Sequence, residues 1–343
     1  MRKHHAAVRS DRHRRLSAFL ASHSDIELTA LMDTGRSISV GVGGGAAVVD
    51  ADGEPVFVKR VPMTDRELAN PGSTVNLYDL PLFCQYGIGG PSFNAWRELA
   101  ANLIVTDGVL AGGTQSFPML YHWRILAGRS PIAAEHADID TVVAAQGDCA
   151  AVRIRLEELA AATSSLVLFC EYIPYPMQDW LSENPVDKAA TVEQQLSEIV
   201  TFLGDRQLLH MDGHFGNMRT DGERIYLTDF GLATSLHFDL SVAERDFAER
   251  HVTHDADYAA MRLVNWLVTD ICGVPMPTSG GPVARNEYVR LCAAGHIPDG
   301  VPSEVAAILA RRAPAAAEMN AFLWKLFGGD IHAEYPGMNP ADT

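Results

Sequence analysis

Positive charge is in short supply along this 343-residue chain, which has 27 Lys and Arg residues against 43 Asp and Glu. The formal net charge of −16 at pH 7 argues against a nucleic-acid partner, because phosphate backbones are bound by basic surfaces. An acidic surface favours a cationic substrate, although solubility alone explains most of these carboxylates.

Cysteine is sparse as well. The cysteines are odd in number and none is spaced as Cys-x-x-Cys: Cys84, Cys149, Cys170, Cys272 and Cys292. This usage suits a reducing compartment in which the thiols are simply buried. Histidine pairs at helical spacing with a third ligand are also missing, which argues against a histidine-based metal centre.

Long apolar runs are missing too, so we expect no membrane-spanning segment. Residues 1–23 are basic but lack the apolar core and the small-residue cleavage site of a secretory signal. Together with the few cysteines, this predicts a cytoplasmic protein.

The most informative stretch is residues 208–231. Leu208 and Leu209 lead into His210, Asp212 and Asn217. A hairpin is expected next, with Asp221-Gly222 at its turn and residues 225–227 as the returning strand. That strand leads to Asp229, Phe230 and Gly231.

Three polar side chains are therefore placed in loops at the ends of short strands: Asp212, Asn217 and Asp229. Phosphoryl transfer from a nucleotide needs a carboxylate to orient a hydroxyl, and an amide with a second carboxylate to hold Mg²⁺. The stretch supplies these residue types in that order.

The pattern His-x-Asp-x-x-x-x-Asn followed by Asp-Phe-Gly resembles the catalytic and metal-binding loops of the protein-kinase-like superfamily. His214, two residues after Asp212, looks like the aminoglycoside phosphotransferase and choline-kinase branch. The sequence Asp229-Phe-Gly-Leu-Ala looks more like a protein kinase.

This resemblance implies an α+β, bilobal fold, with a small antiparallel-sheet lobe carrying one main helix and a larger, mostly helical lobe. It also implies ATP, with GTP as the alternative, and Mg²⁺ as cofactors. Asp212 would orient the acceptor hydroxyl and accept its proton, and Asn217 and Asp229 would hold Mg²⁺. His210 and Phe230 would brace the loops, and His214 would line the acceptor site or fix the loop.

Residues 35–61 are expected to form three strands, near 37–42, 46–49 and 56–61. Residues 41–48 match a glycine-rich phosphate-covering loop, in which Ala46 replaces the last glycine; its members are Gly41, Gly43, Gly44, Gly45 and Ala46. A glycine-rich hairpin turn is the simpler interpretation of these residues. The strand after it ends at Lys59, which resembles the family's phosphate-binding lysine.

Such a lysine normally pairs with a glutamate on the next helix. We assign this role to Glu98, because the apolar positions of its helix would pack it against the sheet, and Glu67 is the rival. Glu67 lies in an unusual insertion at about 63–92, whose role the sequence does not decide. Further strands are expected at 117–126 and 165–173, and in the latter the backbone of Glu171, Tyr172 and Ile173 would hold the adenine edge.

The domain prediction follows from these assignments: an N-terminal helical extension at 1–34, a nucleotide-binding lobe at 35–173 and a catalytic and substrate-binding lobe at 174–343. We expect the basic arm of the extension to be a solvated tail rather than to dock on a partner or on the rest of this acidic chain. In the second lobe, capping boxes at Thr191 and Ser241 should begin helices, and Pro314 should break or kink the last helix.

The sequence does not decide the roles of two groups of carboxylates in residues 239–257. Asp255 or Asp257 would either brace the catalytic loop or, more simply for Asp255, cap a helix. The carboxylates of this region would form either a rim for a cationic substrate or a solvated face.

The functional hypothesis is an ATP-dependent phosphotransferase that acts on a hydroxyl of a small, cationic metabolite or antibiotic. The alternatives are a Ser/Thr-type protein kinase, whose substrate would be a protein, and a kinase-fold binding protein without activity. No nucleic-acid or membrane partner is expected.

Overall fold

The computed structural model describes residues 2–41, 44–279 and 281–337, which form two compact units. The first unit contains Met1–Ile173 and Thr228–Arg245, and the second contains Pro174–Leu227 and Asp246–Thr343. One division between the units falls at 173/174, and segment 228–245 returns to the first unit.

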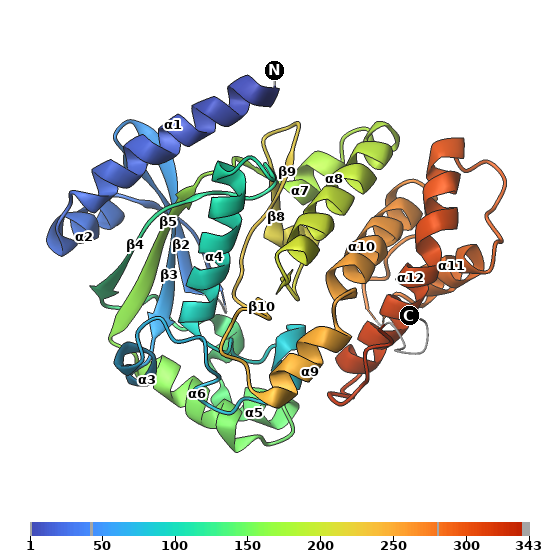
Figure 1. Ribbon diagram of the computed structural model, residues 1–343. Helices are drawn as coiled ribbons and strands as arrows, with labels where there is room; N and C mark the ends of the chain where they lie inside the picture. The colour runs from blue at the N-terminus through green and yellow to red at the C-terminus, as the bar shows by residue number, and fades with distance from the viewer. Residues whose placement is uncertain (1, 42–43, 280, 338–343) are drawn as a thin grey trace. The chain divides into compact units, whose positions relative to one another are not determined.

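An antiparallel sheet of five strands forms the centre of the first unit. Its strands are β1 (Arg36–Gly41), β2 (Gly44–Ala51), β3 (Glu54–Met63), β4 (Leu120–Ala127) and β5 (Ser164–Glu171), in the order β1-β2-β3-β5-β4. A largely helical region follows along the chain (Figure 1). The predicted α+β class, with an N-terminal antiparallel sheet and later helices, is thus confirmed.

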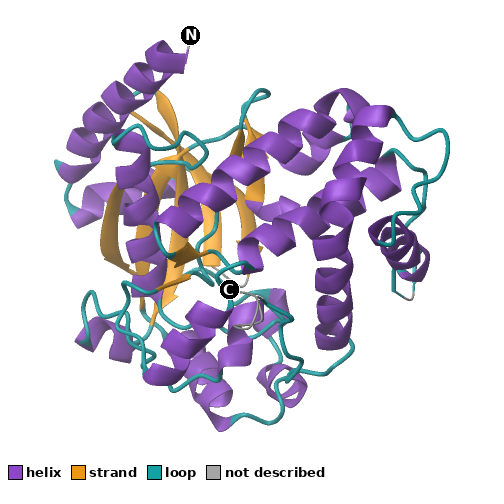
Figure 2. Cartoon of the chain, turned by 45° about the vertical axis from the view of Figure 1, so that its right-hand side comes forward, coloured by secondary structure: helices purple, strands orange, loops and turns teal. Residues whose placement is uncertain are grey.

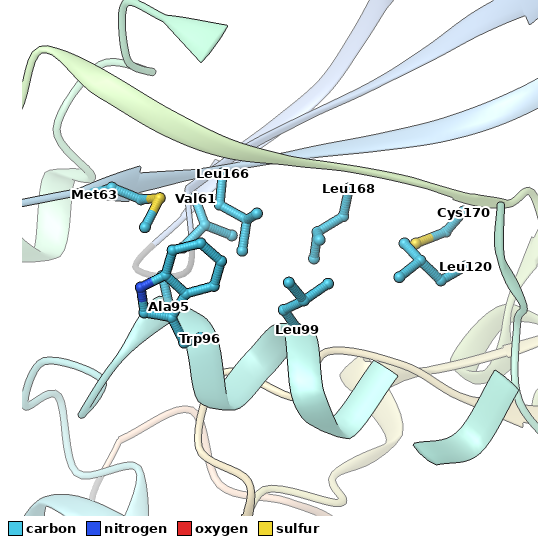
Figure 3. Packing of buried hydrophobic residues seen from close by; sticks show 9 residues of the cluster. All are labelled: Val61, Met63, Ala95, Trp96, Leu99, Leu120, Leu166, Leu168 and Cys170. Atoms are coloured by element: carbon cyan, nitrogen blue, oxygen red, sulfur yellow. The ribbon is translucent and has the colours of Figure 1, made fainter. Parts of the chain in front are cut away.

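The sheet is covered on both faces, since almost every residue of β5 is buried. Leu166, Leu168 and Cys170 project towards α4 (Ala95–Leu110). On that helix Ala95, Trp96 and Leu99 complete an apolar core with Val61, Met63 and Leu120, as Figure 3 shows. This packing fixes the first turn of α4, where Glu98 lies, against β3.

The opposite face of the sheet is covered by α1 (Arg2–Ala21) and α2 (Asp25–Asp33), which lie beside it in Figure 1. Arg9 of α1 is only 1% exposed and pairs with Glu171 of β5. Arg15 binds Asp52 and Glu54. The expectation of a solvated basic tail is therefore wrong, because Arg9, Arg12 and Arg15 of α1 pair with carboxylates of the same unit.

The insertion at about 63–92 contains α3 (Asp65–Ala69) and η1 (Leu82–Tyr86). It shares a core with a later helical segment composed of η2 (Ala134–His136), α5 (Ile139–Ala145) and α6 (Ala150–Ala161), through residues such as Tyr78, Val143 and Leu156. A fully buried ion pair between Glu67 and Arg155 joins the two, at 2.8 Å. The insertion is thus a packed element.

The second unit begins with the long helix α8 (Pro185–Asp205) and several short elements around it: β6 (Tyr175–Pro176), α7 (Met177–Leu181), β7 (Leu208–Leu209), η3 (Phe215–Asn217), β8 (Met218–Thr220) and β9 (Ile225–Leu227). The predicted hairpin forms, since β8 and β9 pair with Thr220 opposite Ile225. Helix α8 begins at Pro185, so the Thr191 capping box is not its start; proline at the first helical position needs no N–H partner.

The remaining elements are β10 (Thr234–Ser235), α9 (Val242–Arg250), α10 (His254–Asp270), α11 (Val283–Ala293) and α12 (Ser303–Phe327). The Ser241 capping box is present, because Ser241 and Glu244 exchange backbone and side-chain hydrogen bonds. In the second unit α12 packs against α8, α10 and α11, and helices make up most of this unit in Figure 2.

The expected break at Pro314 is absent, because α12 continues through it with Leu309, Ala313 and Ala316 buried. In the described part of the terminal segment, the Tyr335 hydroxyl bonds Asp257 and its ring stacks on His251. None of the helices in the described ranges is long and apolar enough to cross a membrane.

Candidate active site

Lys59 is the centre of a charged group in the first unit. Its Nζ lies 2.6 Å from Glu98 Oε1 and 2.7 Å from Asp229 Oδ1. The period of two along β3 places Lys59 on the same face as Val61 and Met63, which is the face that α4 covers. The partner of Lys59 is therefore Glu98 of α4 and not Glu67 of α3.

Burial and charge act in opposite directions on this group. Burial lowers the pKa of Lys59, but Asp229 and Glu98 outweigh this effect and raise it, so that the ammonium stays charged. Burial raises the pKa of Glu98 and Asp229 adds to the increase, against the effect of Lys59. With both carboxylates ionised the group has one negative charge in excess, which a cation bound by Asp229 would offset.

The Asp229 side chain is 40% exposed, unlike those of its two partners, and its backbone is in the left-handed region at φ 64°. A non-glycine residue pays a steric cost there and needs surroundings that hold it. The Gly231 N–H donates to Asp229 Oδ1 at 3.2 Å, and the buried ring of Phe230 packs 6.2 Å from that of Phe117. These contacts hold Asp229 in place, so that part of its carboxylate stays exposed to solvent beside Lys59.

A second polar group lies in the second unit. Asn217 Nδ2 donates to both the carbonyl and Oδ2 of Asp212, at 3.0 Å each. His214 Nε2 lies 3.7 Å from the same Oδ2, and the Asp212 side chain is 30% exposed. Asp212 and Asn217 are thus neighbours, and His214 lies beside Asp212.

Asp255 stabilises this loop by accepting two backbone hydrogen bonds. Its carboxylate accepts the backbone N–H groups of His210, at 2.6 Å, and of Met211, at 3.0 Å. Met211 needs such support because its φ is 66°. The N-cap interpretation of Asp255 is wrong, because α10 begins at His254 and its N-cap is Thr253.

The pKa of Asp255 is lowered even though burial alone would raise it, because His254, His210 and the backbone N–H bond favour the carboxylate. A lowered pKa in the folded state contributes stability above the unfolded value, near 3.9, and this contribution disappears as the pH falls through the folded value. Urea unfolding should therefore show that Asp255→Asn destabilises the protein at pH 7 and that the difference from wild type shrinks below about pH 3.9. A difference that stays constant with pH would contradict this.

The glycine-rich segment is only partly described, since Gly43 and Val42 lie outside the described residues. Gly41 pairs with Gly44 across β1 and β2, and Ala46 pairs with Lys59. A Cβ at Gly44, whose φ is 111°, would lie 2.1 Å from the Arg60 carbonyl oxygen. Glycine at 44 is therefore required by strand packing.

Gly45 is also explained by a contact within the unit. Its N–H donates to Ser130 Oγ at 3.0 Å, and a Cβ there would lie 2.4 Å from that oxygen. This N–H is thus taken by Ser130, and the interpretation of Gly45 as a free phosphate donor does not fit this conformation.

The predicted connector, Glu171 to Ile173, begins at the last residue of β5. The Glu171 N–H donates to the Met119 carbonyl at 2.8 Å, and its carboxylate binds Arg9 and Arg12. Burial would raise the pKa of Glu171, but these arginines lower it. The side chain of Glu171 therefore has a structural role. Its partner Arg9 could not be identified from the sequence, where it is only one of several basic residues in the N-terminal arm.

The insertion also holds the chain that follows Asp229. Gln85 Nε2 donates to the Leu232 carbonyl at 2.6 Å, and Thr74 Oγ1 exchanges hydrogen bonds with the N–H and carboxylate of Asp239. Arg97, next to Glu98 on α4, pairs with Glu244 at 2.6 Å. Segment 232–244 is thus fixed by contacts within the first unit.

Thr234 and Ser235 of this segment are buried, at 3% and 0% exposure. Glu244, Asp255 and Asp257 are engaged by Arg97, the 210–211 loop and Tyr335, whereas Asp246 and Glu249 are exposed. The rim for a cationic substrate therefore stays a prediction.

In the described ranges no three His, Cys, Asp or Glu side chains are grouped as metal ligands. The donors present suit Mg²⁺, which usually takes one or two carboxylates and completes its shell with water and phosphate oxygens. Asp229 of the first unit has such a carboxylate, and Asn217 of the second unit has an amide oxygen. No family model matches this sequence, and no curated protein matches it.

Proposed function

We propose that the protein is an ATP-dependent phosphotransferase that transfers the γ-phosphoryl group to a hydroxyl of a small molecule. The observation that carries this proposal is the group of Lys59, Glu98 and Asp229, whose members come from β3, α4 and the chain after β9. Three segments far apart in the sequence supply a phosphate-binding cation, its support and a metal-binding carboxylate.

In the proposed mechanism Lys59 binds nucleotide phosphate oxygens, and Glu98 keeps its ammonium in place. Mg²⁺, held by Asp229 and Asn217, would neutralise charge on the phosphates. Asp212 orients the acceptor hydroxyl for in-line attack and accepts its proton. The proposal requires both polar groups to act on one nucleotide.

Two observations favour a small acceptor over a protein. His214 lies beside Asp212, where the small-molecule branch that the loop resembles has a histidine. The segment after Gly231 is short and fixed by Gln85, Thr74 and Arg97, and its Thr234 and Ser235 hydroxyls are buried. A segment switched by phosphorylation needs an accessible hydroxyl. A protein kinase remains the second candidate because of the Asp229-Phe-Gly-Leu-Ala sequence.

The test is ATP and GTP consumption with Mg²⁺ against a panel of hydroxylated and amine-bearing metabolites and against generic protein acceptors. Wild type should transfer phosphate to a small hydroxyl compound, and Asp212→Ala should not. Asp205→Ala is the matched control, because Asp205 is an exposed carboxylate at the end of α8 in the same unit. Transfer to proteins alone would support the kinase alternative, and no nucleotide binding would reject both enzymes.

A further inference from the structure

The guanidinium of Arg9 is almost completely buried, as is that of Arg155. Its Nε lies 3.0 Å from Glu171 Oε1, and its Nη2 lies 2.5 Å from Glu171 Oε2. Nη2 also donates to the Phe117 carbonyl at 2.8 Å, and Nη1 donates to the carbonyl and the side-chain oxygen of Gln115 at 3.0 and 2.9 Å. Arg12, one turn further along α1, binds the same carboxylate.

These bonds join α1 to two backbone segments at one end of the sheet. One is the end of β5, where Glu171 precedes Tyr172 and Ile173. The other is the chain that enters β4, and the two are joined further because the Met119 N–H lies 3.3 Å from Glu171 Oε2. A planar guanidinium can bridge a carboxylate and two carbonyls at once, which a lysine ammonium cannot do with the same geometry.

The chain entering β4 also contacts the segment that carries the proposed metal ligand. Phe117 is fully buried, and its ring packs 6.2 Å from that of Phe230 at an interplanar angle of 37°. Phe230 follows Asp229, whose carboxylate binds Lys59. Arg9 is therefore connected through Phe117 and Phe230 to the strained residue at 229.

We propose that Arg9 is a positioning residue for nucleotide binding: α1 sets the end of β5 and, through Phe117, the placement of Asp229. The inference rests on the proposed function, since it assigns Arg9 to the same nucleotide site. Arg9 touches no substrate in this proposal and acts through residues 117, 171 and 230. The N-terminal helices are then part of the binding unit and not an appendage.

The test compares the Arg9→Met and Arg9→Lys variants of the full chain with wild type, with a non-hydrolysable ATP analogue and Mg²⁺ as the probe. Both variants should bind the analogue about 2- to 30-fold more weakly, which is the range for residues that act through a packed network. Arg15→Met is the matched control, because Arg15 is on the same helix but pairs with Asp52 and Glu54 at the surface. Its affinity for the analogue should equal that of wild type.

A second readout separates positioning from general destabilisation. Native-state hydrogen exchange should show faster exchange at 117–120, 171–173 and 229–231 in Arg9→Lys, while the core of α4 stays protected. If the folded Arg9 variants bind the analogue as tightly as wild type, the inference is wrong and the proposed function stands. If wild type itself does not bind the analogue, the inference and the proposed function are both wrong.

Discussion

Replacing Asp212 with asparagine should lower kcat for phosphoryl transfer about 10²- to 10⁴-fold, the usual contribution of a positioned general base. The amide has nearly the size of the carboxylate and can still accept the bond from Asn217 Nδ2, which is 3.0 Å from Asp212 Oδ2. It cannot accept a proton from the acceptor hydroxyl. The KM for the nucleotide should change little, because the phosphates are assigned to other residues.

The effect is measured by initial rates at saturating ATP and Mg²⁺ with the acceptor found in the panel. Asp205→Asn, which changes an exposed carboxylate of the same unit, should retain the wild-type kcat. A fully active Asp212→Asn enzyme would contradict the assignment of the base, and a large increase in the nucleotide KM would move Asp212 to the binding of metal or phosphate.

Arg155→Met should lower the free energy of unfolding by about 3–5 kcal/mol, as is usual when one member of a buried ion pair is removed. Arg155 and Glu67 have 1% and 0% side-chain exposure, and two parallel bonds of 2.8 Å join them. Without the guanidinium, Glu67 stays in the interior as a carboxylate held only by Thr64 and the Ala95 N–H.

Two further variants make this prediction specific. Glu67→Gln added to Arg155→Met should recover part of the loss, because the remaining partner no longer has a buried charge. Arg153→Met, which removes a partly exposed arginine of the same helix, should leave the urea midpoint nearly unchanged. Urea denaturation monitored by circular dichroism measures the stability of all three variants. An unfolding midpoint of Arg155→Met equal to that of wild type would contradict the account.

The same ion pair affects the candidate site. Glu67 Oε1 accepts the N–H of Ala95 at the start of α4, and the Trp96 indole donates to the Glu67 carbonyl, both at 2.8 Å. These bonds hold the first turn of the helix that carries Glu98. Glu67, the rejected partner of Lys59, thus supports the residue that takes this role.

Local patterns were sufficient where neighbouring residues decide the conformation. The hairpin of β8 and β9 follows from its turn residues and β-branched strand, and the Ser241 capping box forms as its spacing predicts. The pairing of Lys59 with Glu98 could be predicted as well, because the resemblance implies such a pair and the apolar face of the helix favours Glu98 over Glu67.

Contacts between distant residues could not be predicted where neither a local pattern nor the resemblance points to them. Arg9 and Glu171 are 162 positions apart, and neither has a local pattern that names the other. The sequence shows a basic arm and an acidic chain, and only the packing of Leu16 and Leu20 of α1, both fully buried, makes the arm dock. Ser130 likewise meets Gly45 across 85 positions, and no local pattern shows that the Gly45 N–H bonds Ser130 or that a Cβ at Gly44 would meet the Arg60 carbonyl.

Proline 314 shows how tertiary packing overrides a local rule. A proline inside a helix removes one hydrogen bond and crowds the preceding turn, which predicts a break. Here α12 is packed along α8, α10 and α11, and the apolar residues on both sides of Pro314 are buried. The burial of this long helix outweighs the local cost.

The most direct test of the central claim is calorimetric titration of the protein with ATP in the presence of Mg²⁺, on wild type and on two variants, one in each unit. If the residues of both units act on one nucleotide, wild type should show a single saturable site that depends on Mg²⁺. Asp229→Asn and Asn217→Ala should each weaken it. Saturable binding that either substitution leaves unchanged would contradict the account.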